Sequence, residues 1–454
     1  MQNNSSVNLM TEGNYKIKML KFAVPVFFGN LFQTLYTAID SVVVGNYIGP
    51  EALAAISSNA NLTSMMVGMF MGFGTGVSVV VGQSIGKGDK EKIGKAVHSA
   101  ISLGILLGLL ATVFGITMGK TFLQMMGTPA EVIGQSVTYI RIYFGGSLAM
   151  ILYNVLSGIL QASGDSKDPL KYLIISSIVN TVVDILFVAV LHLGIGGAAL
   201  ATVLSQVLCV SMALRKLMNV NDDIRVSFPN IRFDGEMTRK ILKIGFPSAL
   251  QWTLIDLSNV IIQSYINSFG TFAMAGYGAA TRIEGFTHIP IRAMEAALIT
   301  FVSQNYGAKN YERIKKGIVF GVFTGVVVIE CIGTFTFIFA NQLVSIFNSD
   351  PEVMMYGVTR LRTCAFFFGI LGFSNMMAGT IEALGKPLYS TLTSLICWCG
   401  LRVLVLNTIG RVYHFFSLSC IIYPITWTLS ASVFAILYFK YLRVNYLSED
   451  RKDY

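Results

Sequence analysis

The sequence has few charged residues for its length. Only 13% of its 454 residues are Asp, Glu, Lys or Arg, whereas a soluble globular domain has about 25%. Hydrophobic residues make up 54% of the chain, and apolar stretches recur from one end to the other. A chain of this length that folded in water would divide into about two or three domains. We therefore expect one continuous membrane domain.

Residues with reactive side chains are also scarce. The chain has six cysteines and four histidines, and all the cysteines lie in apolar stretches. Cys397 and Cys399 have neither the CxxC spacing nor the further ligands of a metal site, so we predict that the cysteines are buried, unreactive thiols. The HExxH, GxSxG and GxxxxGK[ST] patterns do not occur. We expect no metal centre, no cofactor and no enzymatic activity.

The formal net charge of +9 raises the question of a nucleic-acid partner. A nucleic-acid binder clusters its Lys and Arg residues on one face of a soluble domain. Here they lie in short segments between apolar stretches. The basic charge therefore indicates membrane topology, and we expect no nucleic-acid partner.

The apolar stretches predict an all-α integral membrane protein with twelve transmembrane helices. A helix of about 20 residues crosses the hydrocarbon core of a bilayer, which is about 30 Å thick. The predicted spans lie near residues 20–45, 53–82, 97–119, 133–160, 170–191, 195–215, 242–267, 274–303, 317–340, 353–381, 388–410 and 414–439.

Every second connection between the spans is basic. Cytoplasmic loops are enriched in Lys and Arg, and basic residues gather near 16–21, 87–95, 167–171, 215–243, 309–316, 386 and 440–452. The opposite connections hold little beyond Lys120 and Arg411. This alternation predicts an even number of spans in the cell membrane, with both termini cytoplasmic.

The two halves of the sequence repeat each other at an offset of 221 residues. Gln83-Ser-Ile-Gly86 matches Gln304-Asn-Tyr-Gly307, and Pro25 and Pro247 each stand near the start of the first span of a half. Halves of six spans keep the same orientation, so the copies are parallel, as in many transporters. We predict two pseudo-symmetric six-helix lobes around a central cavity: an N-lobe (1–215), a cytoplasmic linker (216–240), and a C-lobe with a cytoplasmic tail (241–454).

Several motifs occur in order along nearly the whole chain. They are Pro25 with Asp40, Gly82-Gln83-xx-Gly86, Ser163-Gly164-Asp165, Ser303-Gln304-Asn305-xx-Gly307-Ala308 and Ala383-Leu384-Gly385-Lys386-Pro387. In this combination the sequence resembles the multidrug and toxic compound extrusion (MATE) family, and its first half is similar to the DinF-like branch.

The resemblance implies two lobes that form a V-shaped cavity. It also implies an antiporter that exports small organic compounds, often cationic or amphipathic, in exchange for inward H⁺ or Na⁺. Members of the DinF-like branch use an Asp of the first span and an Asn-xxx-Asp of the fifth, which correspond here to Asp40, Asn180 and Asp184. We expect a monomer in membrane lipid. An alternative is a flippase or exporter of lipid-linked precursors or metabolites from the same superfamily.

The positions of Asp40 and Asp184 point independently to a coupling site. Asp40 lies 19 residues past Lys21, and Asp184 lies 13 residues past Lys171. These spacings correspond to about 28 Å and about 20 Å of helix, so both carboxylates fall in the outer half of the membrane. A carboxylate there costs about 2.5–3.5 kcal/mol and is a functional candidate. The alternative is that each Asp only hydrogen-bonds a neighbouring helix.

Two carboxylates in a dry site cannot both ionise cheaply, so one would take up a proton from outside and release it inside. Asn180, Thr202 and Asn154 are the candidate hydrogen-bonding partners, and the same oxygens would also suit Na⁺. Pro25 removes a backbone hydrogen bond, so the span that carries Asp40 can bend during the transport cycle.

The C-lobe carries a different set of polar residues. Glu284, His288, Arg292 and Glu295 recur at helical spacing in the eighth span, so they share one helix face. With Asp256 they either line a substrate cavity or form an internally neutralised packing face. The repeat aligns Asp184 with Arg402, and the depths of Asp256 and Arg402 predict that these two form an ion pair. Glu330 stands alone in the ninth span and either snorkels or lines the cavity.

Overall fold

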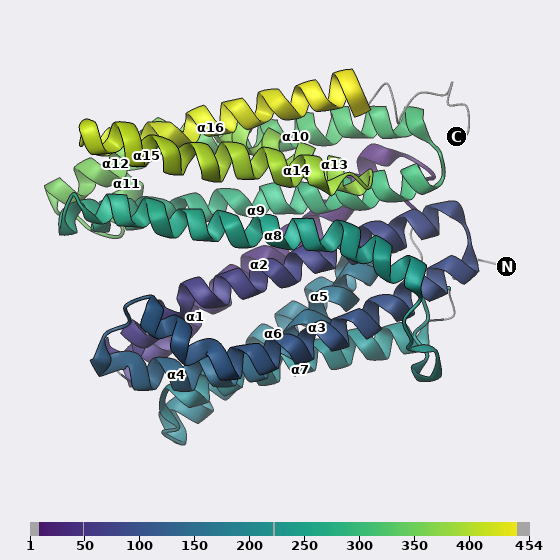
Figure 1. Ribbon diagram of the computed structural model, residues 1–454, viewed down its shortest axis with the longest axis horizontal. Coiled ribbons are helices and arrows are strands. Elements are labelled where there is room, and N and C mark those ends of the chain that lie inside the picture. Colours follow the sequence, from purple (N-terminus) through teal and green to yellow (C-terminus); the bar gives the residue numbers. More distant parts are fainter. Residues whose placement is uncertain (1–8, 49, 221–222, 443–454) are drawn as a thin grey trace. The chain divides into compact units, whose positions relative to one another are not determined.

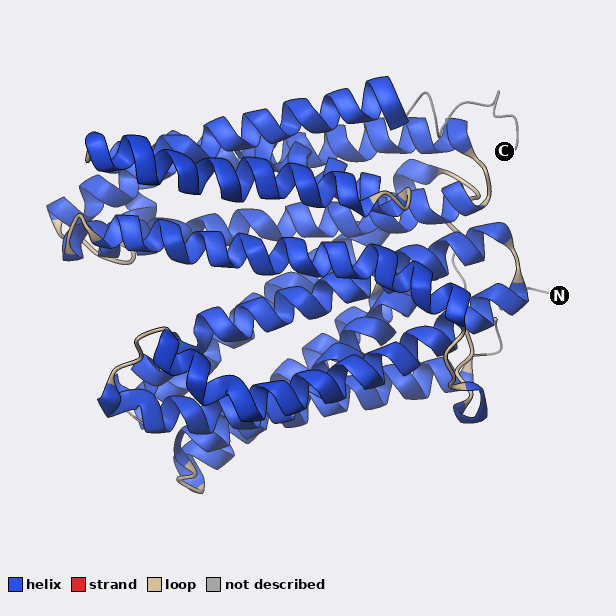
Figure 2. Ribbon diagram, viewed as in Figure 1, coloured by secondary structure: helices blue, strands red, loops and turns tan. Residues whose placement is uncertain are grey.

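The computed structural model describes residues 9–48, 50–220 and 223–442. Within these ranges all regular structure is helical and no strand occurs (Figures 1 and 2). The first half contains α1 (Tyr15–Tyr47), α2 (Pro50–Lys87), α3 (Lys90–Met125), α4 (Ala130–Gly145), α5 (Ser147–Ala162), α6 (Lys167–Ile185) with the π-helical extension η1 (Leu186–Val190), α7 (Gly194–Asn219) and the short 3-10 helix η2 (Phe228–Asn230).

The second half repeats this order. It contains α8 (Gly235–Asn267), α9 (Thr271–Gly307), α10 (Tyr311–Ile338), α11 (Ala340–Ser345), α12 (Pro351–Ala365), α13 (Phe368–Ala383), α14 (Pro387–Ser394), the π-helix η3 (Leu395–Gly400), α15 (Leu401–Val412), α16 (Phe416–Ile436) and the π-helix η4 (Leu437–Leu442).

The described helices supply the twelve predicted spans. Seven helices are long and apolar enough to cross a membrane, and the bent pairs α4–α5 and α12–α13 bring the number to nine. The other three, α1, α8 and α9, contain 33, 33 and 37 residues, more than the about 20 that a bilayer requires. The charged residues of α9 explain its lower mean hydropathy.

Two of the predicted spans are broken helices. The axis bends by 45° between α4 and α5 and by 57° between α12 and α13. The first break falls at Gly146, whose N–H donates to Ile142 O and Tyr143 O. Hydropathy alone did not reveal either break, because the apolar run continues through both.

The repeated Gly164 and Gly385 end corresponding helices in the same way. Both have positive φ, 83° and 77°, a conformation that glycine adopts without steric cost. The N–H that follows each glycine donates five residues back, from Asp165 to Leu160 O and from Lys386 to Ile381 O. This is the Schellman arrangement of a helix C-terminus, so these motif glycines fix the turn between two spans.

The chain forms two compact units that exchange the beginnings of their first helices. One unit holds Phe28–Ala249, and the other holds Met10–Phe27 together with the chain from Leu250 onward. The beginning of α8 lies backbone to backbone against α2, because a Cβ on Gly76 would stand only 2.6 Å from Gly245 N. The units change two residues past Pro25 and two past Pro247.

The connection between the halves is packed onto the first unit. The Ser227 N–H donates to His98 Nε2 at 3.1 Å, and the Asp234 N–H donates to Ser99 Oγ at 2.9 Å. Asp234 also accepts from Met237 N at the start of α8.

Among the cysteines, four are buried, Cys399 is partly buried and Cys331 is exposed on α10, so the prediction of buried thiols is wrong for Cys331.

Candidate ion-coupling and substrate sites

A buried polar stripe runs along α6. Ser176, Asn180 and Asp184 follow one another at intervals of four residues, and their exposed fractions are 4%, 2% and 1%. Ser176 Oγ donates to Ser205 O of α7 at 2.8 Å. Residues four apart share one helix face, so the stripe faces α7 over two helical turns.

The register of α6 against α7 locates the rest of this stripe. Cys209 Sγ donates to Tyr172 O, one turn before Ser176 on α6 and one turn after Ser205 on α7, so the two antiparallel helices keep one register over this turn. Continued by one turn, this register brings Asn180 to the level of Thr202, which is 7% exposed. Thr202 Oγ1 donates to Ala198 O at 3.2 Å. The structure therefore brings three predicted residues, Asn180, Asp184 and Thr202, to one interface.

Asn154 lies on a different interface. Its Nδ2 donates to Met150 O at 2.9 Å, and a Cβ on Gly74 of α2 would stand 3.1 Å from Asn154 O. Asn154 thus belongs to the contact of α5 with α2, and the described contacts do not bring it to the α6 stripe.

Asp40 is part of α1, but its side chain lies outside the described residues. The contact between α1 and α6 is fixed lower down, where a Cβ on Gly29 would stand 3.4 Å from Leu173 Cδ1. Position 40 follows Gly29 by eleven residues, and Asp184 follows Leu173 by eleven. Since both helices rise about 1.5 Å per residue, this contact agrees with the similar depths expected from the sequence.

The α6 stripe contains a polar atom that has no partner among the described residues. Asn180 Nδ2 is buried without a hydrogen bond within the described part of the chain. Leaving such a donor unsatisfied costs about 1–3 kcal/mol. A buried amide one turn from a buried carboxylate is a set of groups that can bind a proton or a cation with its water.

The second unit contains a buried ion pair between α9 and α12. Glu284 of α9 accepts two hydrogen bonds from Arg360 of α12, each 2.9 Å long, and Arg360 is only 1% exposed. The guanidinium lies 3.8 Å from the ring centre of Tyr423 and 5.2 Å from that of Tyr277. This pairing engages Glu284 in packing, and sequence reasoning missed Arg360 as its partner.

Arg402 of α15 lies close to this cluster but makes no ion pair among the described residues. Its Nε donates to Thr426 Oγ1 at 2.9 Å, and its guanidinium stands 4.1 Å from the ring centre of Tyr423. Its Nη2 is buried without a hydrogen-bond partner in the described chain. The predicted Asp256–Arg402 pair is wrong, because depth along a helix does not determine the direction in which a side chain points.

Asp256 lies on α8 one turn after Trp252, and Trp252 contacts Arg292, the third residue of the predicted α9 stripe. The Arg292 guanidinium lies 5.3 Å from the ring centre of Trp252, so it faces α8. The Glu295 side chain lies against α13, where a Cβ on Gly379 would stand 2.8 Å from Glu295 Cγ.

The four α9 residues therefore do not share one environment. Glu284 faces α12, Arg292 faces α8 and Glu295 faces α13, while His288 is exposed. Pro290 lies inside α9 between the first and the second pair. Proline removes a backbone hydrogen bond and bends a helix, so a regular helical face cannot be continued across it.

Glu330 has a defined partner. Its Oε2 accepts from the Gly369 N–H at 2.8 Å, and Gly369 is the second residue of α13. The first N–H groups of a helix lack internal acceptors and carry partial positive charge. Glu330 therefore caps the helix that begins after the break in the α12–α13 span.

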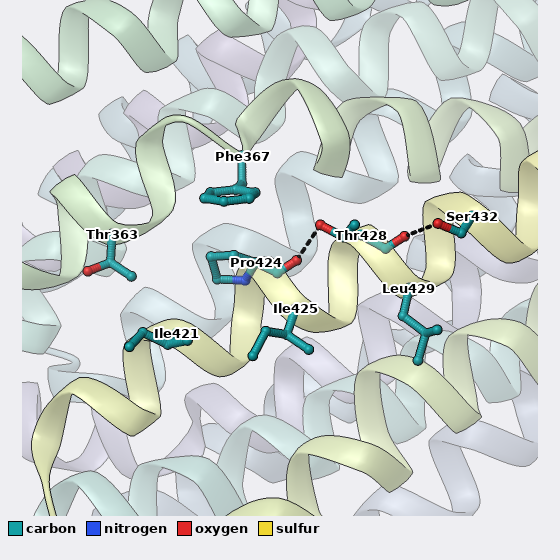
Figure 3. A pocket seen from close by; sticks show the side chains of 8 residues that line it. All are labelled: Thr363, Phe367, Ile421, Pro424, Ile425, Thr428, Leu429 and Ser432. Carbon is teal, nitrogen blue, oxygen red and sulfur yellow. Dashed lines mark hydrogen bonds between the residues drawn. The ribbon is translucent and has the colours of Figure 1, made fainter.

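An apolar groove of about 550 Å³ lies beside the same break (Figure 3). Its hydroxyl groups are engaged, since Thr428 donates to Pro424 O and Ser432 donates to Thr428 O. Ile425 is 51% exposed, and no charged residue lines the groove. It suits an acyl chain or an apolar part of a substrate. Its lining residues are Thr363, Phe367, Ile421, Pro424, Ile425, Thr428, Leu429 and Ser432.

The sequence matches one protein family model, MatE, in two segments, residues 25–186 and 247–408. These segments are equal in length, fall one in each half and cover more than half of the chain. The chain belongs to the MATE family. The double match also agrees with the internal repeat found in the sequence, and membership makes the chain a membrane transporter.

Individual MATE relatives cover most of the chain. The probable multidrug resistance protein YoeA of Bacillus subtilis is 28% identical over 392 residues, 85% of each protein. The FAD transporter of Shewanella oneidensis is 25% identical over 397 residues, 86% of this chain and 87% of that protein. A crystal structure of MATE in the bent conformation has a TM-score of 0.88 at 23% identity, covering 95% of this chain and 96% of that one.

Proposed function

We propose that this MATE transporter exports small organic compounds, cationic or amphipathic, in exchange for H⁺ or Na⁺ that binds in the first unit. The observation that carries the coupling site is the buried stripe of α6, with Asp184 1% exposed inside a membrane span. A carboxylate costs several kcal/mol there unless it binds a partner. Binding and release of a cation would change the charge of the stripe.

The expected cycle assigns a role to each group. Asp184 and Asp40 would hold the proton or the cation, and Asn180 and Thr202 would supply further oxygen and nitrogen atoms. Because two close carboxylates repel each other when both are ionised, release of the ion would favour a rearrangement of α1 against α6. We further propose that the protein acts as a monomer in the cell membrane, with both termini in the cytoplasm.

The test is gradient-driven transport by the purified protein in liposomes. We expect that Asp184→Asn and Asp40→Asn abolish ethidium accumulation driven by an imposed H⁺ or Na⁺ gradient, while the variants remain monodisperse. Asp165→Asn, at the cytoplasmic start of α6, is the matched control and should transport within about twofold of the original protein, because asparagine caps a helix about as well as aspartate. Near-normal transport by both Asp184→Asn and Asp40→Asn would disprove the coupling site.

Export of an anionic metabolite is a second candidate, supported by the buried Nη2 of Arg402, which has no hydrogen-bond partner in the described part of the chain. A buried guanidinium without a carboxylate is suited to a carboxylate or phosphate group. The relative from Shewanella oneidensis is named an FAD transporter. The two candidates differ in a competition assay, because an anionic nucleotide should inhibit ethidium transport only if both compounds share a site. Loss of that inhibition in Arg402→Met would assign the anion to this residue.

A further inference from the structure

A second groove, separate from the proposed transport sites, lies where α1 and α10 begin. It has a volume of about 480 Å³ and belongs to the second unit. Both helices start here in segments that the positive-inside rule places at the cytoplasmic face. The residues that line the groove are Tyr15, Lys16, Glu312, Lys315, Lys316, Val319, Phe320 and Phe323.

The upper part of this groove has excess positive charge. Three lysines face a single carboxylate, and Lys315 pairs with that carboxylate, Glu312, at 2.6 Å. Lys16 and Lys316 are exposed and make no ion pair within the described residues. Two ammonium groups thus remain available at one end of the groove.

The lower part of the groove is apolar and exposed at the surface of the unit. Val319 and Phe323 are 64% and 68% exposed, and they follow Lys315 and Lys316 at helical spacing on one face of α10. Seven residues separate Lys316 from Phe323, which corresponds to about 10 Å of helix. The groove therefore passes from charge to hydrocarbon over the distance that separates a phosphate from the upper part of an acyl chain.

The wall of the groove is held in place by contacts between its aromatic rings and by hydrogen bonds of Arg313. Tyr15 packs edge-on against Phe320, with ring centres 6.0 Å apart. Arg313 donates to Met10 O at 3.1 Å and to Glu12 O at 2.8 Å, which fixes the segment before α1. The Lys16 Nζ lies 5.7 Å from the ring centre of Phe320.

We propose that this groove binds an anionic phospholipid of the cytoplasmic leaflet. The phosphate lies between Lys16 and Lys316, and one acyl chain lies along Val319 and Phe323. The cytoplasmic leaflet is rich in anionic lipid, and basic pockets between helices on that side bind such headgroups. A soluble anion would use the two ammonium groups but leave the exposed apolar half of the groove uncovered. The site holds lipid as a ligand and is independent of the ion-coupling stripe.

The experiment measures lipid retention by the full-length protein in detergent, using native mass spectrometry with equimolar phosphatidylglycerol and phosphatidylcholine. The test variant is Lys16→Gln/Lys316→Gln. The control variant, Lys90→Gln/Lys95→Gln, removes the same charge from the start of α3, where both lysines pair with carboxylates. Each groove lysine should contribute about fivefold to the preference for phosphatidylglycerol. The test variant should therefore lose about 25-fold, and the control should change little.

Two further arms separate the lipid from its parts. Phe323→Ala should weaken retention of long-chain phosphatidylglycerol more than retention of a short-chain form, whereas inorganic phosphate and glycerol phosphate should not displace the lipid. If the test and control variants lost the preference for phosphatidylglycerol equally, the overall charge of the protein rather than this groove would explain it. Displacement by inorganic phosphate would mean an anion site only. Either result would overturn the proposal.

Discussion

The two units place different side chains at the same three positions of corresponding helices. Ser176, Asn180 and Asp184 of the first unit correspond to Ser394, Trp398 and Arg402 of the second, at the repeat offset less a gap of three residues. All six are buried. The first stripe ends in a carboxylate, and one turn before it the Asn180 Nδ2 has no hydrogen-bond partner among the described residues. The second stripe ends in a guanidinium next to the aromatic rings of Trp398 and Tyr423.

This difference teaches that duplication kept the backbone while the buried charge diverged. Among the described residues, those buried with a charge in the first unit are Asp168 and Asp184, both acidic, whereas the second unit also buries Arg360 and Arg402. An arginine cannot give up its proton in a protein. The second stripe can therefore stabilise structure or bind an anion, but only the first can exchange protons.

The Glu284–Arg360 pair offers the largest test of this comparison. The first unit has Thr63 and Tyr139 at the corresponding positions, so the ion pair is a feature of the second unit alone. Arg360→Met would leave Glu284 buried without its cation, which costs about 3–5 kcal/mol. We expect poor expression or a large fall in the thermal unfolding temperature in detergent. Thr63→Ala is the control and should change that temperature little.

The double variant Glu284→Leu/Arg360→Met removes both charges and should recover most of the stability, because a buried ion pair can often be replaced by apolar groups without loss. If the losses of the single variants simply add, the pair does not stabilise the unit by charge compensation.

Glu330 tests a second difference between the lobes. The corresponding residue in the first unit is Leu109, so the α4–α5 break has no such carboxylate. A hydrogen bond to a charged group contributes about 1.5–3 kcal/mol, and Glu330→Leu should lower stability by about that amount. Glu330→Gln keeps an acceptor and should lose less. The measurement is thermal unfolding in detergent, and a Glu330→Leu variant as stable as the original would show that the α13 N-terminus needs no cap.

The two prolines test whether the lobes contribute equally to conformational change. Pro25 and Pro247 each precede the point where a helix passes from one unit to the other. A hinge of this kind affects turnover, and α1 carries Asp40 whereas α8 carries Asp256. We expect Pro25→Ala to slow ethidium turnover several-fold with little change in substrate affinity, and Pro247→Ala to have a smaller effect. Equal rates in both variants and the original protein would exclude a role for either bend.

Hydropathy and loop charge predicted the spans, because both depend on sequence position alone, while matched segments indicated the repeat and ordered motifs carried the resemblance to the family. Side-chain partners were harder to predict. Asp184 was a candidate because a carboxylate inside a span is costly, and Asn180 because it stands one turn before it on the same helix face. Arg360 was missed although a buried arginine requires a partner and Glu284 was already a candidate. The false Asp256–Arg402 pair shows why: the sequence gives the height of a residue in the membrane, but not its direction around the helix axis.

The smallest expected effect comes from Asp165, which the repeat aligns with Lys386. Asp165 Oδ1 accepts from Lys167 N at 2.9 Å and from Asp168 N at 3.1 Å, so it caps the start of α6. The Lys386 side chain cannot accept hydrogen bonds, and there α14 starts with Pro387, which has no N–H to cap.

Burial raises the pKa of Asp165, and the neighbouring carboxylate of Asp168 raises it further, against the effect of the backbone donors. Because the folded pKa lies above the unfolded value of about 3.9, the folded protein favours the protonated form. The protonated Asp165 carboxyl therefore contributes stability below the unfolded pKa, and this contribution is lost as the pH rises through the folded pKa. Asparagine caps a helix about as well as aspartate and carries no charge. Asp165→Asn should thus raise the unfolding temperature slightly at pH 7.5, and the gain should shrink as the pH falls toward about 4.

Asp89 at the start of α3 is the control of opposite sign, since the Lys92 N–H and the Lys92 ammonium lower the pKa of this exposed carboxyl. Asp89→Asn should therefore lose stability at pH 7.5. If Asp165→Asn also loses stability there, the Asp165 carboxylate stabilises the fold in its ionised form, and the two lobes need not differ at this turn for electrostatic reasons.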